Sequence, residues 1–180
     1  MAKRILFISS SLRAGSNSEI LAREAERGAR EAGHEVHFVS LKDKDIRFCK
    51  GCLACQQTHK CVIDDDAAAI VAKIQHSDVL VFATPIYYYE LSGQLKTLLD
   101  RCNPLFPQQY AFREVYLLST SAEGGDQVYA GAVNGLQGWI SCFAHSRFAG
   151  NFSGGGINDA REAISQPELL HQAYLFGRNL

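Results

Sequence analysis

The chain has 180 residues, 47% of them hydrophobic, and its formal net charge is −1. A chain of this length and composition usually folds as one domain with a sizeable core, so we expect residues 1–180 to form a single domain. Because the charge is balanced and no long basic run is present, nucleic acid and anionic membranes are poor candidate partners.

The start of the chain, MAKRILFISSSLR, contains only a short apolar run before polar sequence resumes. That run is too short for a signal peptide, and no later stretch has the length and hydrophobicity of a membrane-spanning helix. We therefore expect a cytoplasmic protein, in which thiols are kept reduced.

The first predicted elements are a strand and a helix. Residues 3–9, KRILFIS, form a short apolar run typical of a strand that is buried on both faces. Ser16 and Glu19 have the spacing of a capping box, which predicts a helix that begins there and continues to about Ala32. The predicted inward face of this helix is Leu21, Ala25, Gly28 and Ala32.

Two further elements follow on either side of a cysteine-rich segment. Residues 34–41 are more polar than the first strand and predict an edge strand. Asp64, Asp65 and Asp66 precede an amphipathic pattern of Ala67, Ile70, Val71 and Ile74, so we expect a helix with acids at its positive end. A receiver-like phospho-acceptor cluster is the alternative for these acids, but they open a helix and do not end a central strand.

The second half of the chain continues the alternation. The predicted elements are a strand at 78–85, a helix with Leu95, Leu98 and Leu99 that ends near Arg101, a strand at 114–121, a helix from about Asp126, a weak strand at 146–152 and a helix from about Pro167. Five strands alternating with helices predict a doubly wound α/β fold, with a five-stranded parallel sheet and helices on both faces. Ligands of such sheets bind beyond the carboxyl ends of the strands, so the loops after strands one, three and four are candidate sites.

The first of these loops, SSSLRAGSNS at 9–18, places hydroxyl groups and one arginine before a helix N-terminus. Free backbone N–H groups and the helix dipole favour an anion there. The loop has neither a G-x-G-x-x-G pattern nor a Walker lysine, so a permanently held monophosphate suits it better than a dinucleotide or a transferred phosphoryl group. A polar loop with a capped helix and no ligand is the alternative.

The other two loops differ in character. In the loop that begins at Thr84, Pro85 is followed by three consecutive tyrosines, which suit either a flat heteroaromatic ring or an oligomer interface. The third loop, STSAEGGD at 119–126, has small residues that allow a ligand to approach the backbone closely.

Together, S-x-R-x-G-S-N-S at 11–18, T-P-x-Y at 84–87, S-G-x-L-K at 92–96 and the D-R pair at 100–101 resemble the NAD(P)H-dependent FMN reductase family of flavodoxin-like folds. The resemblance covers the first 101 residues well and the remainder only by element order. It implies bound FMN, with the phosphate on Ser11, Arg13, Ser16, Asn17 and Ser18. It places the flavin ring against Pro85, Ile86, Tyr87, Tyr88 and Tyr89, with Ser119, Thr120, Ser121 and Gly124 closing the third side. One departure is Ser10, where the family usually has glycine.

The activity that the resemblance implies is transfer of reducing equivalents from NAD(P)H to a quinone, azo, nitro or free-flavin acceptor. The flavin carries this chemistry, so no acid–base pair is assigned. We also expect at least a homodimer, because a closed two-fold contact is the commonest way to bury a patch such as the three tyrosines.

Four of the six cysteines, Cys49, Cys52, Cys55 and Cys61, have the spacing C-x2-C-x2-C-x5-C. This crowding is unlike the separated pairs of zinc sites and resembles iron–sulfur ligation, including that of the iron–sulfur flavoproteins, a branch of the same family with a 4Fe–4S cluster. Plain reduced thiols are the interpretation we favour, with His59 a solvent-facing residue and not a further ligand. The alternative function is an electron carrier that holds this cluster and is fed by a protein donor such as ferredoxin.

Overall fold

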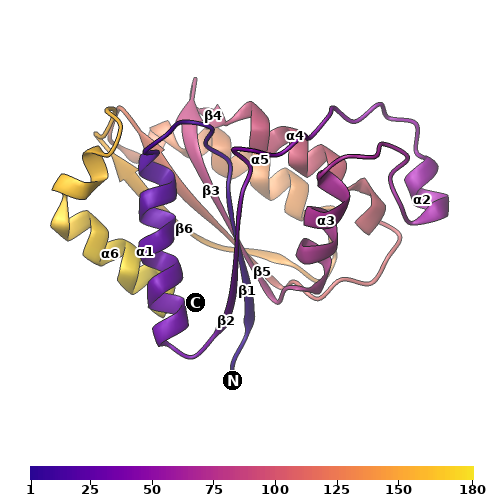
Figure 1. The fold of residues 1–180 in the computed structure, drawn as a ribbon, viewed down its shortest axis with the longest axis horizontal. Coiled ribbons are helices and arrows are strands. Elements are labelled where there is room, and N and C mark those ends of the chain that lie inside the picture. Colours follow the sequence, from indigo (N-terminus) through magenta and orange to yellow (C-terminus); the bar gives the residue numbers. More distant parts are fainter.

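The structure is a computed structural model that describes residues 1–180, and its centre is a parallel sheet (Figure 1). The five parallel strands are β1 (Arg4–Ser9), β2 (Glu35–Ser40), β3 (Val79–Tyr87), β5 (Glu114–Ser121) and β6 (Arg147–Gly155). They lie in the order β2-β1-β3-β5-β6, so the predicted polar strand β2 is an edge strand. This order confirms the predicted flavodoxin-like α/β fold.

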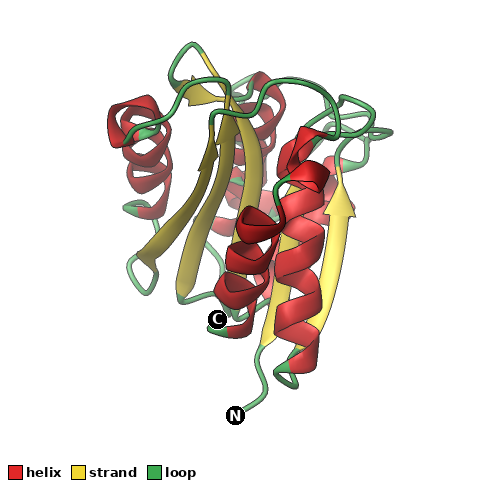
Figure 2. Cartoon of the chain, turned by 90° about the vertical axis from the view of Figure 1, so that its left-hand side faces the viewer, coloured by secondary structure: helices red, strands yellow, loops and turns green.

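Helices cover both faces of the sheet (Figures 1 and 2). Helices α1 (Asn17–Glu31) and α6 (Pro167–Arg178) lie on one face, and α3 (Ala67–His76), α4 (Gly93–Arg101) and α5 (Ala130–Ile140) lie on the other. Each layer has its own apolar core, because the buried strands present side chains alternately to the two faces. No helix combines the length and apolar character needed to cross a membrane.

Several short elements were not predicted. They are helix α2 (Ala54–Thr58), strand β4 (Glu90–Leu91), which pairs antiparallel with β3, and the 3-10 turns η1 (Asn103–Leu105), η2 (Asp126–Val128) and η3 (Glu162–Ser165). The helix predicted from Asp126 is wrong by one turn, because η2 precedes α5, which begins at Ala130. The last strand is longer than predicted, since its pairing with β5 continues to Gly155.

Helices α1 and α6 approach each other closely through glycine. A Cβ atom at Gly28 would overlap the backbone of Tyr174, and one at Gly177 would overlap the backbone of Ala25. Leu21, Ala25 and Gly28 are buried as predicted, but Ala32 is exposed because α1 ends at Glu31. Small residues therefore determine how closely α1 and α6 pack against each other.

Only half of the predicted capping box forms at the start of α1. The Ser16 hydroxyl accepts the Glu19 amide at 3.3 Å, as expected of an N-cap. The Glu19 carboxylate does not return to the Ser16 amide; it accepts the hydroxyls of Ser9 and Ser40, each at 3.2 Å. Glu19 therefore ties α1 to the ends of β1 and β2.

A buried ion pair fixes the segment between β2 and α3. The Arg101 guanidinium donates to both carboxylate oxygens of Asp65, at 2.6 and 2.9 Å, and neither side chain is exposed. Asp65 also accepts the Ala67 amide at the start of α3, so the acids open this helix as predicted. Burial opposes ionisation of Asp65, but the hydrogen bonds from Arg101 and from two backbone amides outweigh it, so the pKa of Asp65 lies below its ordinary value.

We predict that Asp65→Asn destabilises the protein by about 3–5 kcal/mol at neutral pH, because it leaves a buried guanidinium unpaired. A lowered pKa in the folded state contributes stability above the unfolded value, about 3.9, and that contribution is lost as the pH falls through the folded value. The free energy of unfolding in urea, measured from pH 7 to pH 3, should therefore fall more steeply for the wild type than for the variant. If the difference in the free energy of unfolding between the two proteins stays constant over this pH range, Asp65 does not have a lowered pKa in the folded state.

Candidate functional site

A cavity of about 300 Å³ opens beyond the carboxyl ends of the central strands, where the chain leaves β1 and β3 toward opposite faces of the sheet. Four segments line it: Ser11, Arg13, Ser16 and Asn17 from the first loop; Pro85, Ile86, Tyr87 and Tyr88 from the second; Thr120, Ser121 and Ala122 from the third; and Ile157 and Asn158 after β6. The three loops singled out in the sequence thus converge on one cavity.

Four of the predicted site residues do not line this cavity. The Ser18 hydroxyl is buried against that of Ser16, at 3.0 Å, and the Ser119 hydroxyl bonds with that of Ser153 on β6, at 3.1 Å. Tyr89 turns its hydroxyl to Glu123. Gly124 lies close to Gly155, where an added Cβ would be 2.9 Å from its α-carbon.

The first loop presents polar groups at the N-terminus of α1. Gly15 has φ +69°, which favours glycine, and it turns the chain into the Ser16 N-cap. Hydroxyls, an arginine and free helical N–H groups thereby face one end of the cavity. Such an end can hold a phosphate group.

A segment that the sequence did not link to this loop packs against it. We call residues 157–163 the strap. Two of its backbone carbonyls accept hydrogen bonds from the first loop. Arg13 Nη1 donates to the Asn158 carbonyl at 2.6 Å, and Asn17 Nδ2 donates to the Asp159 carbonyl at 2.9 Å. The Ala163 amide donates to Asn17 Oδ1 at 3.1 Å, so the strap contacts both the amide nitrogen and the amide oxygen of Asn17. The only sequence feature near the strap is the glycine-rich stretch that precedes it. Because the strap binds through backbone carbonyls, which every residue type has, its side chains show no pattern that predicts these contacts.

The unusual Ser10 is fully buried and has a structural role directly before the first residue that lines the cavity. Its hydroxyl bonds with the Ser92 hydroxyl, at 2.9 Å, and with the Ala83 carbonyl, at 3.2 Å. The Thr84 and Ser92 hydroxyls are 3.1 Å apart, and all three side chains are buried. Ser92 is also the N-cap of α4. The serine that replaces the expected glycine therefore joins the first loop to β3 and α4.

The tyrosines form a tight hairpin at the other end of the cavity. Tyr88 and Tyr89 have φ of 51° and 64°, a left-handed conformation at both centres of the turn, where asparagine and glycine are usual. Tyr88 is fully exposed, at 99%, and Tyr87 and Tyr89 are about half exposed. Tyr89 donates its hydroxyl to Glu123, at 3.0 Å, and this bond raises the pKa of Tyr89. Glu123, which was not among the predicted site residues, links the hairpin to the third loop.

The four clustered cysteines are unpaired and do not form a metal site in this conformation. Cys55 is buried, Cys49 and Cys52 are exposed, and no three cysteine, histidine or acidic side chains lie close enough to share a metal ion. Burial raises the pKa of the Cys55 thiol. As placed, these residues do not fit a 4Fe–4S cluster.

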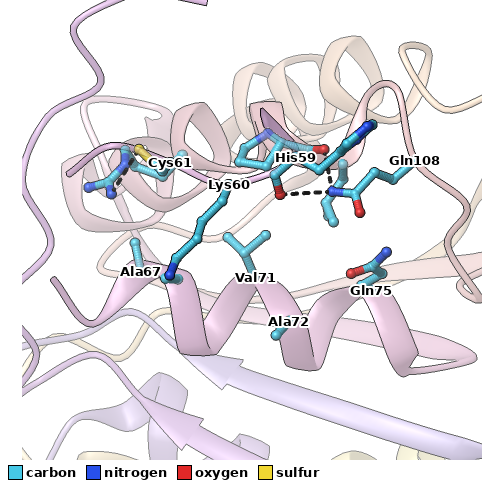
Figure 3. A pocket seen from close by; sticks show the side chains of 12 residues that line it. His59, Lys60, Cys61, Ala67, Val71, Ala72, Gln75 and Gln108 are labelled. Atoms are coloured by element: carbon cyan, nitrogen blue, oxygen red, sulfur yellow. Dashed lines mark hydrogen bonds between the residues drawn. The ribbon is translucent and has the colours of Figure 1, made fainter. Parts of the chain in front are cut away.

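N–H groups nevertheless point to three of these sulfur atoms. The Gly51 amide donates to Cys49 at 3.4 Å, Asn103 to Cys55 at 3.5 Å, and Arg101 to Cys61 at 3.4 Å. Figure 3 shows Cys61 at the edge of a separate cavity of about 230 Å³, which Lys60 crosses toward α3. Apolar side chains of α3, including Val71, form its floor. This cavity does not share a lining residue with the one at the strand ends.

Comparisons with known proteins agree with this arrangement. A family model described as NADPH-dependent FMN reductase matches residues 3–153. An iron-sulfur flavoprotein of Methanosarcina thermophila is 30% identical over 165 residues, which cover 88% of this chain and 85% of that protein. An iron-sulfur flavoprotein of Methanocaldococcus jannaschii is 39% identical over 102 residues, which cover 57% of this chain and 53% of that protein, so this match spans about half of the relative's length.

Among solved structures, an NAD(P)H:quinone oxidoreductase from Methanothermobacter marburgensis superposes with a TM-score of 0.74. It covers 99% of this chain and 97% of its own, and at 13% identity it supports the fold alone. The family model spans well over half of the chain, and the Methanosarcina relative aligns over most of its length. The chain therefore belongs to the NADPH-dependent FMN reductase family.

Proposed function

We propose that the protein is an FMN-containing oxidoreductase that passes reducing equivalents from NAD(P)H to a small acceptor, namely a quinone, azo, nitro or free-flavin compound. The observation that carries this proposal is the cavity at the strand ends, with hydroxyls and Arg13 at one end and Pro85 and the tyrosine hairpin at the other. A phosphate group matches the first end, and a flat ring matches the second.

At the phosphate end, Ser11 and Ser16 can donate hydroxyl hydrogen bonds, and Arg13 can add a charge-assisted one. Arg13 already lies along this end, where it donates to the Asn158 carbonyl. A phosphate oxygen offers this guanidinium a stronger acceptor than a neutral carbonyl. The loop therefore binds the cofactor by its charged group.

At the ring end, the cavity is lined by Pro85 and Ile86 and, beside them on the neighbouring strand, by Thr120 and Ser121. Bound FMN supplies a ring that accepts and passes on reducing equivalents. The residues orient that ring, and the cavity remains open beside Tyr87, which is half exposed, while Tyr88 projects from the tip of the hairpin. A nicotinamide and then an acceptor can use the open side in turn.

We also propose that the protein is a homodimer and works in the cytoplasm. The exposed tyrosine hairpin offers an aromatic surface that a two-fold contact would bury. All six cysteines are unpaired, which agrees with a reducing compartment.

A second candidate function is an iron–sulfur electron carrier. The N–H groups that point to the sulfurs of Cys49, Cys55 and Cys61 favour it, because such bonds stabilise thiolate ligands. Two relatives named as iron-sulfur flavoproteins point the same way. The four thiols do not lie close enough together to bind one cluster, which argues against an electron carrier. A reductase with plain thiols therefore remains our proposal.

For the reductase, we predict that purified protein loaded with FMN oxidises NADPH in the presence of a quinone. Arg13→Ala combined with Ser16→Ala should weaken FMN binding at least a hundredfold, because each of the two lost bonds to a charged phosphate contributes about 1.5–3 kcal/mol. Riboflavin, which lacks the phosphate, should bind almost equally to both proteins. Quenching of flavin fluorescence measures both affinities.

The control for this pair is Lys73→Ala, which removes a positive charge from an exposed residue on α3 outside the cavity. Equal losses for FMN and riboflavin would disprove the phosphate assignment. Absence of NADPH oxidation by FMN-loaded wild-type protein would disprove the proposed activity.

For the dimer, we predict that Tyr88→Asn shifts the protein toward a monomer in light scattering. Asparagine tolerates the left-handed backbone of this position, so the change removes the aromatic contact without straining the hairpin. Phe106→Ser, which alters another exposed aromatic residue, serves as the control and should leave the dimer intact. A wild-type monomer that binds FMN and is fully active would contradict the proposal.

For the cysteines, we predict that Cys52→Ser with Cys55→Ser leaves FMN affinity and NADPH oxidation unchanged, with a stability loss of about 1 kcal/mol from buried Cys55. Neither side chain lines the flavin cavity. Iron and acid-labile sulfide should be analysed in protein prepared without oxygen. Stoichiometric amounts in the wild type that vanish in the variant would favour the electron carrier instead.

A further inference from the structure

The strap contains an arginine whose guanidinium has no polar partner in the protein. Arg161 is the one arginine of the chain whose side chain makes neither a hydrogen bond nor an ion pair. Its acidic neighbours do not pair with it, since the Glu162 carboxylate accepts the amides of Asn158 and Asp159 instead. A free cation is therefore held beside the first loop.

The position of Arg161 is fixed by its backbone and by Gly15. The Arg161 amide donates to the Gly15 carbonyl at 2.8 Å. A Cβ atom built on Gly15 would lie 2.8 Å from Arg161 Cγ and 3.3 Å from Nε, so the arginine stem rests directly on this glycine. In Figure 1 the loop that follows β6 reaches the start of α1, where Gly15 leads into the helix.

The backbone of Arg161 is also unusual. Its φ is 65°, in the left-handed region that non-glycine residues seldom adopt. Buried residues on both sides, Ile157 at 4% exposure and Ala163 at 0%, anchor the strap and hold this conformation. Such conformations persist where the surrounding structure imposes them, and they are concentrated at ligand sites.

We propose that Arg161, which lies against Gly15 just outside the lining of the cavity, is a second cationic ligand for the phosphate of FMN in addition to Arg13. This proposal rests on the proposed function and extends it, because the strap lies beyond residue 153, where the match to the family model ends. A phosphate monoester carries nearly two negative charges at neutral pH, and Arg13 compensates only one of them. The strap already meets the first loop through Asn17 and Gly15, and the Arg161 stem rests on Gly15, so a rotation of this unpaired side chain can bring its guanidinium to the loop.

The test separates the charge of Arg161 from its backbone. Arg161→Gly removes the guanidinium and relaxes the left-handed backbone, so the fold should be retained. FMN binding should weaken about tenfold, as expected for one charge-assisted hydrogen bond, while riboflavin binding stays within about twofold of the wild type. Arg161→Lys should restore part of the FMN affinity, because it keeps the charge and loses the planar fork. The dependence of FMN affinity on salt concentration should decrease in the glycine variant only.

Three results would overturn this role. The first is an FMN affinity of Arg161→Gly equal to that of the wild type. The second is an equal loss of affinity for FMN and for riboflavin. The third is a change confined to the KM for NADPH, which would assign Arg161 to the dinucleotide phosphate. The Lys73→Ala variant controls for net charge. If the Arg13 and Ser16 changes weaken FMN while Arg161→Gly does not, the proposed function stands and this inference falls. If the wild type binds no FMN, both fall.

Discussion

The site depends on three hydroxyl groups buried at the point where the strand order reverses. Ser10 follows β1, Thr84 lies in β3 near its carboxyl end, and Ser92 precedes the first turn of α4. A buried hydroxyl without a hydrogen-bond partner costs free energy. They satisfy one another, and the Ser92 amide adds a bond to the Thr84 hydroxyl at 3.2 Å. The cavity lining begins at Ser11 in the first loop and at Pro85 in the second, so this one network sets the distance between the two ends of the cavity.

The tyrosine hairpin shows how a strained turn is maintained. Two left-handed tyrosines cost on the order of 1–3 kcal/mol each, and the surrounding contacts must supply that energy. The pairing of Tyr87 with Glu90, the bond from Tyr89 to Glu123 and the close contact of α5 with the Tyr89 carbonyl all hold the turn. Gly131 makes that last contact because a side chain there would overlap the carbonyl. The strain keeps Tyr88 in the solvent, beside the open side of the cavity.

The sequence was sufficient for the fold and for most of the cavity, because both depend on local patterns. Apolar runs marked the strands, and polar loops at strand ends marked the walls. Ala32 and the start of α5 were misplaced because helix ends are set by capping and by 3-10 turns that periodicity does not detect. The strap was missed for another reason. Its contacts to Arg13 and Asn17 use backbone carbonyls more than 140 positions away, and any residue type can supply them.

The two ends of the cavity are built for different purposes. Around the phosphate loop, Ser16, Asn17 and Ser18 are buried, and the strap holds them from outside. At the other end, the tyrosine side chains are exposed, and the hairpin is held by its pairing with Glu90 and by contacts with Glu123 and α5. A ligand anchored through its charged group keeps its position while the other face stays accessible, and successive partners can then exchange on that face without loss of the cofactor. Under the proposed function, this polar anchor would hold FMN by its phosphate while small acceptors exchange beside the aromatic end of the cavity.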